Sequence, residues 1–122
     1  MHEQDDQDDQ APAQWNFPFE ASLHEVFPAL HEAHNGWMSA IDSLHAPDRK
    51  THELIRMVVT VIVRNPAGIR RHAQLAREVG ATWEEILGAI MLTAPGAGVL
   101  PAVAAIPSAR EGYEAARDVE FD

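Results

Sequence analysis

The chain has 122 residues, a formal net charge of −10 and no cysteine. This length fits one domain with a modest core. The acidic balance, without a basic stripe or interleaved aromatic residues, argues against nucleic-acid binding. The absence of cysteine excludes disulfides, thiolate metal sites and dithiol peroxidase chemistry. No apolar run is long enough to span a bilayer and residues 1–10 do not resemble a secretory signal, so we expect a cytoplasmic protein without membrane contact.

The first twenty residues differ in composition from the rest. Half of the net charge lies within residues 1–10, in Glu3, Asp5, Asp6, Asp8 and Asp9. A block of like charges without apolar side chains is typical of a disordered, solvated tail. Prolines and aromatic residues follow it, and they suggest an extended arm that packs onto the body or onto a neighbouring subunit. We therefore predict a tail and arm over residues 1–20 and a single all-α domain over residues 21–122.

The first predicted helix begins at Pro28, a favourable first-turn residue, and tolerates Gly36. Its apolar stripe consists of Leu30, Ala33, Trp37, Ala40, Ile41 and Leu44. Residues 45–48 then form a turn, in which Asp48 can cap the next helix.

Residues 49–64 form the second predicted helix, although the β-branched run over residues 54–63 could also be a buried strand. The run is too long for an ordinary strand. Polar residues recur at steps of three or four and draw one stripe along a helix, namely Glu53, Arg56, Thr60 and Arg64. The helix is otherwise apolar on most sides, so a monomer would expose a large patch, and we expect a homo-oligomer.

His72 lies in the third predicted helix, over residues 66–79. It falls on the apolar stripe of that helix, so its ring is expected to point inward. Gly80 can take a positive φ and end the helix. Thr82 and Glu85 can then form a capping box for the helix that follows.

That fourth helix is predicted over residues 83–93. The Pro-Gly-Ala-Gly sequence of residues 95–98 then breaks the chain. A last helical region over residues 101–119 contains Pro107, which is expected to kink it or split it in two.

These features resemble the carboxymuconolactone decarboxylase family, which includes the alkyl hydroperoxidase D proteins. The shared pattern is a helix glutamate at Glu53, a histidine nineteen residues later at His72, and a Gly-Ala-Thr-x-x-Glu-Ile junction over residues 80–86. The peroxidase branch carries two cysteines, whose positions fall on Asn65 and Gly68 here. The chain is therefore similar to the cysteine-less, decarboxylase-type branch, which has an Asn-x-Pro-like sequence before the histidine.

The resemblance covers about residues 28–116. It implies an all-α bundle of five to six helices of the alkyl hydroperoxidase D-like type, assembled as a homotrimer or a hexamer. One departure lies near the expected rim of the active site, where Gly98-Val99-Leu100-Pro101 is one residue longer than the Gly-x-Pro of the family.

For function, the resemblance implies a cofactor-free decarboxylase, a lyase that acts by proton transfer on a small carboxylated, lactone-like substrate. His72 would protonate the carbanion that loss of carbon dioxide leaves, while Glu53 orients the imidazole. The candidate substrate-binding residues are Arg56, Arg64 and Arg71 as carboxylate anchors, with Thr60 on the same polar stripe and Trp37 for an aromatic-sized pocket. On the residues alone, Glu53 could equally form a salt bridge with Arg56 or be a solvated acid in the first turn of its helix, and Arg71 could be a solubilising surface charge.

Three alternatives stay open. The same pair could serve isomerisation, dehydration or ring opening. A non-catalytic binding or assembly protein would be favoured if His72 and Glu53 were sealed in the core. A metal site is suggested by His24, His31 and His34. However, His31 and His34 are one residue too close for a zinc-protease motif, and we predict no metal or other cofactor.

Overall fold

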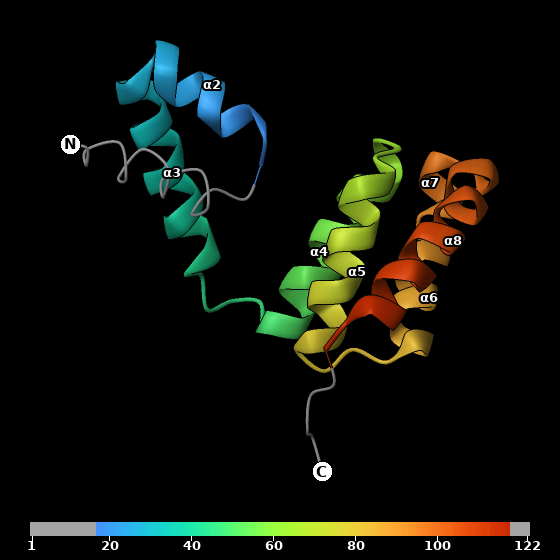
Figure 1. Cartoon of the computed structure of the whole chain (residues 1–122). Helices are drawn as coiled ribbons and strands as arrows, with labels where there is room; N and C mark the ends of the chain where they lie inside the picture. Colours follow the sequence, from blue (N-terminus) through green and yellow to red (C-terminus); the bar gives the residue numbers. More distant parts are fainter. Residues whose placement is uncertain (1–16, 118–122) are drawn as a thin grey trace. The chain divides into compact units, whose positions relative to one another are not determined.

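The computed structural model describes residues 17–117, and every regular element in that range is a helix (Figure 1). The helices are α2 (Phe19–Val26), α3 (Pro28–Asp42), α4 (Arg49–Ile62), α5 (Pro66–Glu78), α6 (Trp83–Met91), α7 (Ala94–Ala97) and α8 (Val99–Ala115). Six of them have eight residues or more, and α7 is a four-residue turn of helix. The predicted all-α class is confirmed. The chain forms two compact units, Met1–Leu44 and His45–Asp122.

The first unit contains α2 and α3, and its start differs from the sequence prediction. Because α2 begins at Phe19, the end of the predicted extended arm is helical and the predicted boundary at residue 20 falls inside this helix. The rest of the arm and the acidic tail lie outside the described residues. A buried polar pair joins the two helices, with Glu20 Oε1 2.9 Å from His31 Nε2.

The helix α3 begins at Pro28 and runs through Gly36, as predicted. Its predicted apolar stripe is nevertheless largely uncovered, since Leu30 is 56 % and Trp37 is 66 % exposed. The buried residue of α3 is His31 instead. Apolar periodicity thus predicted the helix, whereas the face it buries follows from the contact with Glu20, which the periodicity does not contain.

The second unit begins with α4, which is a helix and not a strand. Its N-cap is Asp48, whose side chain accepts hydrogen bonds from the amide and the hydroxyl of Thr51. After the end of α4, Arg64 has φ +57° in the left-handed region. Asn65 Oδ1 then accepts the Gly68 amide at 3.1 Å and caps α5. The turn over residues 63–65 is so short that α4 and α5 lie side by side and antiparallel (Figure 1).

The junction between α5 and α6 has the predicted capping box. Gly80 takes φ +108° after the end of α5. Thr82 Oγ1 accepts the Glu85 amide at 3.0 Å, and Glu85 Oε1 accepts the Thr82 amide at 2.9 Å. Two amides at the start of α6 that have no partner within the helix are thereby satisfied.

We predicted that Pro107 would kink or split this region, and the last helix, α8, is not split there but continues through Pro107. Proline removes one hydrogen bond within the helix, and α8 packs along α5. The two helices come into close contact at Gly112, where a Cβ atom would collide with the backbone carbonyl of Arg70. Only glycine permits this crossing, because the obstacle is backbone and cannot rotate away.

The core of the second unit consists mainly of small and aliphatic side chains. Its members include Met57, Val61, Ile69, Ala73, Ala76, Ile86, Ile90, Ala102, Ala105 and Ala109. Alanines on α5 and α8 allow the two helix axes to come close. In α6, Ile86 and Ile90 face the core, whereas Met91 is 40 % exposed.

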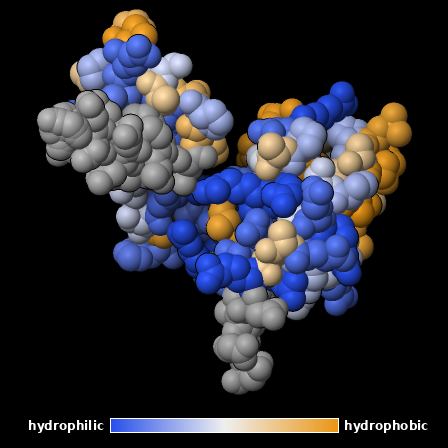
Figure 2. Space-filling model, in the orientation of Figure 1, coloured by the Kyte–Doolittle hydropathy of each residue, from blue (hydrophilic) through white to orange (hydrophobic). Residues whose placement is uncertain are grey.

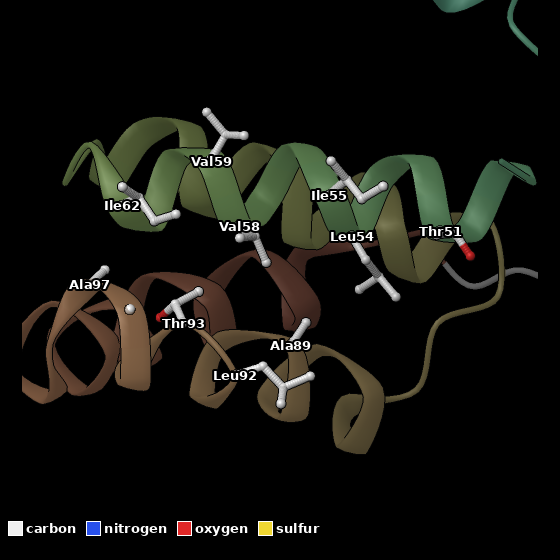
Figure 3. Close-up of a pocket in the computed structure, with 11 residues that line it drawn as sticks. Thr51, Leu54, Ile55, Val58, Val59, Ile62, Ala89, Leu92, Thr93 and Ala97 are labelled. Carbon is white, nitrogen blue, oxygen red and sulfur yellow. The ribbon is translucent and has the colours of Figure 1, made fainter. Parts of the chain in front are cut away.

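Apolar side chains also remain on the surface of the second unit. Figure 2 shows hydrophobic residues gathered over the α7–α8 end, where Leu92 and Leu100 are 80 % and 78 % exposed. A groove of about 540 Å³ lies between α4 and the α6–α7 segment, and Figure 3 shows Leu54 and Val58 extending from α4 into it. Among the described residues, no helix is long and apolar enough to cross a membrane.

Candidate active site

Glu53 and His72 meet between α4 and α5. Glu53 lies near the start of α4 and His72 in the middle of α5, and the short turn between the helices places the two side chains opposite each other. Glu53 Oε1 is 3.2 Å from His72 Nδ1. The structure thus brings together the two residues that the sequence singled out as a pair.

The two partners differ in their access to water. The side chain of Glu53 is 3 % exposed, whereas that of His72 is 15 % exposed. The carboxylate is therefore removed from solvent, while part of the imidazole can be reached from outside. Glu53 is not a solvated surface acid, and the pair is not sealed.

Burial alone would raise the pKa of Glu53, because it disfavours the charged form. The hydrogen bond from His72 and the positive charges of His72, Arg56 and Arg49 act in the opposite direction and together outweigh burial. They hold the pKa of Glu53 below its ordinary value of 4.5. Glu53 is consequently ionised at neutral pH.

The charge of Glu53 decides which nitrogen of His72 carries a hydrogen. An ionised carboxylate can only accept hydrogen bonds, so His72 Nδ1 must be the donor. The other ring nitrogen, Nε2, makes no hydrogen bond to any residue in the range 17–117. Nε2 is therefore the atom that can give a proton to a substrate or take one from it.

Three other predicted site residues lie on the same two helices, Arg56 and Thr60 on α4 and Arg71 on α5. Arg56 is half-buried and acts on Glu53 through its charge. Arg71 precedes His72 on α5 and is also half-buried. Thr60 lies two turns beyond Glu53, and its hydroxyl donates to the Met57 carbonyl at 2.6 Å.

Arg64 and Trp37 lie in other parts of the structure. The end of α4 is nine residues beyond Glu53, which is roughly 14 Å of helix. Arg64 lies past that end and lines a separate groove. Trp37 belongs to α3 in the first unit, and its side chain is exposed.

The positions that correspond to the two cysteines of the peroxidase branch have structural roles in this chain. Asn65 is the N-cap of α5. Gly68 lies against Thr60, so that a Cβ atom at Gly68 would be 2.6 Å from Thr60 Cγ2. A cysteine there would require Thr60 to move, and the contact between α4 and α5 is therefore fitted to glycine.

Two polar contacts escape prediction from the sequence. Arg49 pairs with Glu53 Oε2 at 3.7 Å, and the signal for it was the spacing of four residues on one helix. In the first unit, His31 Nδ1 lies 3.3 Å from His24 Nδ1 while its Nε2 faces Glu20. The sequence signalled this cluster only as a stretch rich in histidine. Within residues 17–117, no three side chains of the types that ligate metals converge on one point.

Comparison with known proteins agrees with this architecture. The sequence profile of the carboxymuconolactone decarboxylase family matches residues 28–111, a range that contains both Glu53 and His72. Among solved structures, the chain is similar to the apo crystal structure of a carboxymuconolactone decarboxylase family protein from Legionella pneumophila. The two share 29 % sequence identity with a TM-score of 0.65, over 77 % of this chain and 83 % of that chain. No curated protein shows a significant match. The chain therefore belongs to the carboxymuconolactone decarboxylase family.

Proposed function

We propose that this protein is a cofactor-free carboxy-lyase, which decarboxylates a small carboxylated, lactone-like substrate with His72 as the proton donor. The observation that supports this proposal is the contact between the buried Glu53 carboxylate and the partly exposed imidazole of His72. A general acid or base needs a group that orients its ring on one side and a path for the substrate to the other side. The buried carboxylate and the partly exposed imidazole provide this arrangement.

The proposed reaction has one carbon–carbon bond cleavage and one proton transfer. The bond between the substrate carbon and its carboxylate breaks, carbon dioxide leaves, and the electron pair is delocalised toward the lactone carbonyl. Protonated His72 then donates its Nε2 hydrogen to the carbon, and water returns a proton to the ring. Glu53 stabilises the imidazolium before transfer and holds the Nδ1–H tautomer after it.

Substrate binding in this proposal relies on the arginines beside the pair. Guanidinium groups bind carboxylates through two parallel hydrogen bonds, and Arg56 and Arg71 flank Glu53 and His72 on the same two helices. Thr60 would offer a hydroxyl farther along α4. Such positioning supplies the part of the rate acceleration that proton transfer alone does not.

Other reactions and a non-catalytic role make different use of the same residues. Isomerisation, dehydration and ring opening also need one positioned proton shuttle, so the pair itself does not distinguish them from decarboxylation. A binding or assembly protein would not need a solvent-accessible imidazole next to a buried carboxylate. The 15 % exposure of the His72 side chain therefore favours an enzyme.

Replacing His72 with alanine should lower the turnover of 4-carboxymuconolactone by roughly a hundred- to ten-thousand-fold. The exposed His45, replaced in the same way, serves as the control and should leave turnover unchanged. Product and carbon dioxide are measured by mass spectrometry, with circular dichroism as the check on folding. Turnover that survives in His72→Ala would exclude His72 as the acid. Absence of turnover by the unmodified protein would rule out this substrate.

The lowered pKa of Glu53 predicts a specific loss of stability in acid. Because its folded-state pKa lies below the unfolded value near 4.5, ionised Glu53 stabilises the fold above that pH. This contribution is lost as the pH falls through the folded-state pKa. The free energy of unfolding in urea should therefore fall more steeply in the unmodified protein than in Glu53→Gln from about pH 5 downward.

A control variant separates this effect from other acids. Asp48 and Glu85 also have lowered pKa values, because the Thr51 hydroxyl and the Thr82 amide, respectively, donate hydrogen bonds to them. Both remain in every variant. Glu111→Gln removes an exposed carboxylate and should keep the acid profile of the unmodified protein. Identical profiles for Glu53→Gln and the unmodified protein would contradict the assignment.

We also propose that the chain assembles as a homo-oligomer, a homotrimer or a hexamer, through the apolar surface of α4. Ile55 and Val59 are each about half exposed there, 51 % and 52 %, beside the groove of Figure 3. Exposed apolar patches of this kind mark interaction sites. Sedimentation velocity should give a mass of three or six chains, and Val59→Glu should reduce it. A single-chain mass for the unmodified protein would refute assembly.

A further inference from the structure

A second groove lies at the end of α4, whereas the candidate active site lies near the start of that helix. It has a volume of about 330 Å³ and is formed by the end of α4, the beginning of α5 and one side of α8. Its walls are apolar, with Ile69, Leu100 and Ala104 among them. Two side chains interrupt this apolar lining, namely Arg64 and Ser108. The volume is at the lower end of the range of small-molecule sites, which is about 300–1,000 Å³.

Arg64 occupies an unfavourable backbone conformation at the edge of this groove. Its φ of +57° lies in the left-handed region, and no other non-glycine residue between 17 and 117 has a positive φ. Glycine adopts this conformation without steric cost, whereas a side chain with a Cβ does so at a penalty. Residues held in such conformations concentrate at functional sites. An arginine in this place is therefore better explained by its side chain than by the turn.

The guanidinium of Arg64 forms no ion pair and no side-chain hydrogen bond with any residue that the structure describes. Other arginines of the same unit are engaged, for example Arg70 with Glu111 and Arg110 with Glu114. No acidic residue lines the groove. The N-terminus of α5 begins beside Arg64, at Asn65 and Pro66, and its dipole adds to the positive potential.

We infer that this groove binds a small organic carboxylate with a compact apolar body. The carboxylate lies on Arg64 and accepts a hydrogen bond from the hydroxyl of Ser108, while the apolar body covers Ile69 and Ala104. A chain with a net charge of −10 repels anions in general. A carboxylate ligand therefore needs a local positive charge, which Arg64 supplies beside the apolar lining of the groove. The site is separate from the Glu53–His72 pair and does not depend on that pair being catalytic.

Benzoate is a suitable probe, with neutral benzamide of the same shape as its comparison. Titration of nitrogen-15-labelled protein should give saturable amide shifts at Ile69, Ala104 and Ala105, larger with benzoate than with benzamide. Arg64→Gly should weaken benzoate binding at least about tenfold, because a charged hydrogen-bonded pair is lost. Its melting temperature should be unchanged or higher, since glycine relieves the left-handed conformation.

Two further variants make the test specific. Arg64→Lys should bind with intermediate affinity, because it keeps the charge but loses the planar fork. Arg117→Gln removes one positive charge from an exposed position outside the groove and should leave affinity unchanged. Unaltered benzoate affinity in Arg64→Gly, an equal loss in Arg117→Gln, or shifts confined to residues outside the groove would each overturn the proposal. Turnover is not a readout here, so failure of the enzymatic proposal would leave this result intact.

Discussion

A carboxylate buried between two helices needs compensating positive charge, because ionisation in a poorly hydrated site is costly. Glu53 obtains this compensation from His72, Arg56 and Arg49, which come from both α4 and α5. The requirement fixes how the two helices pair: a shift of one residue along either helix would turn His72 away from Glu53. The three-residue turn and the Asn65 cap hold that alignment. The position of the polar pair and the packing of α4 against α5 are therefore one constraint.

Small residues maintain this alignment through the rest of the unit. Gly112 lets α8 cross α5 in backbone contact, and Gly68 lets α5 rest on Thr60. Alanines of α5 and α8 lie in the same core, so α8 and the helix that carries His72 cannot move apart without opening voids. Because the core is filled largely by small side chains, large aliphatic residues remain on the outer faces of α4, α6 and α8. The close packing around the site and the exposed apolar surface thus both follow from the small core.

Local rules predicted most of the second unit. The Asp48 and Thr82 caps, the positive φ of Gly80 and the helical state of α4 could all be derived from neighbouring residues, because capping and periodicity are local effects. The contact between Glu53 and His72 followed from the family spacing and a short turn. Prediction failed where packing between elements decides. The burial of His31, the exposure of the α3 stripe and the continuity of α8 through Pro107 depend on residues distant in sequence. So does the separate groove beside Arg64.

Proton transfer by His72 requires one state of its ring, with Nδ1 bonded to Glu53 and Nε2 open. Nitrogen-15 NMR of histidine-labelled protein measures this directly. The chemical shift of a ring nitrogen that carries a hydrogen differs from that of a ring nitrogen that does not. The spectrum of His72→Ala identifies the relevant signals among the seven histidines. The account predicts that neutral His72 carries its hydrogen on Nδ1. A hydrogen on Nε2, with Nδ1 unprotonated, would contradict it.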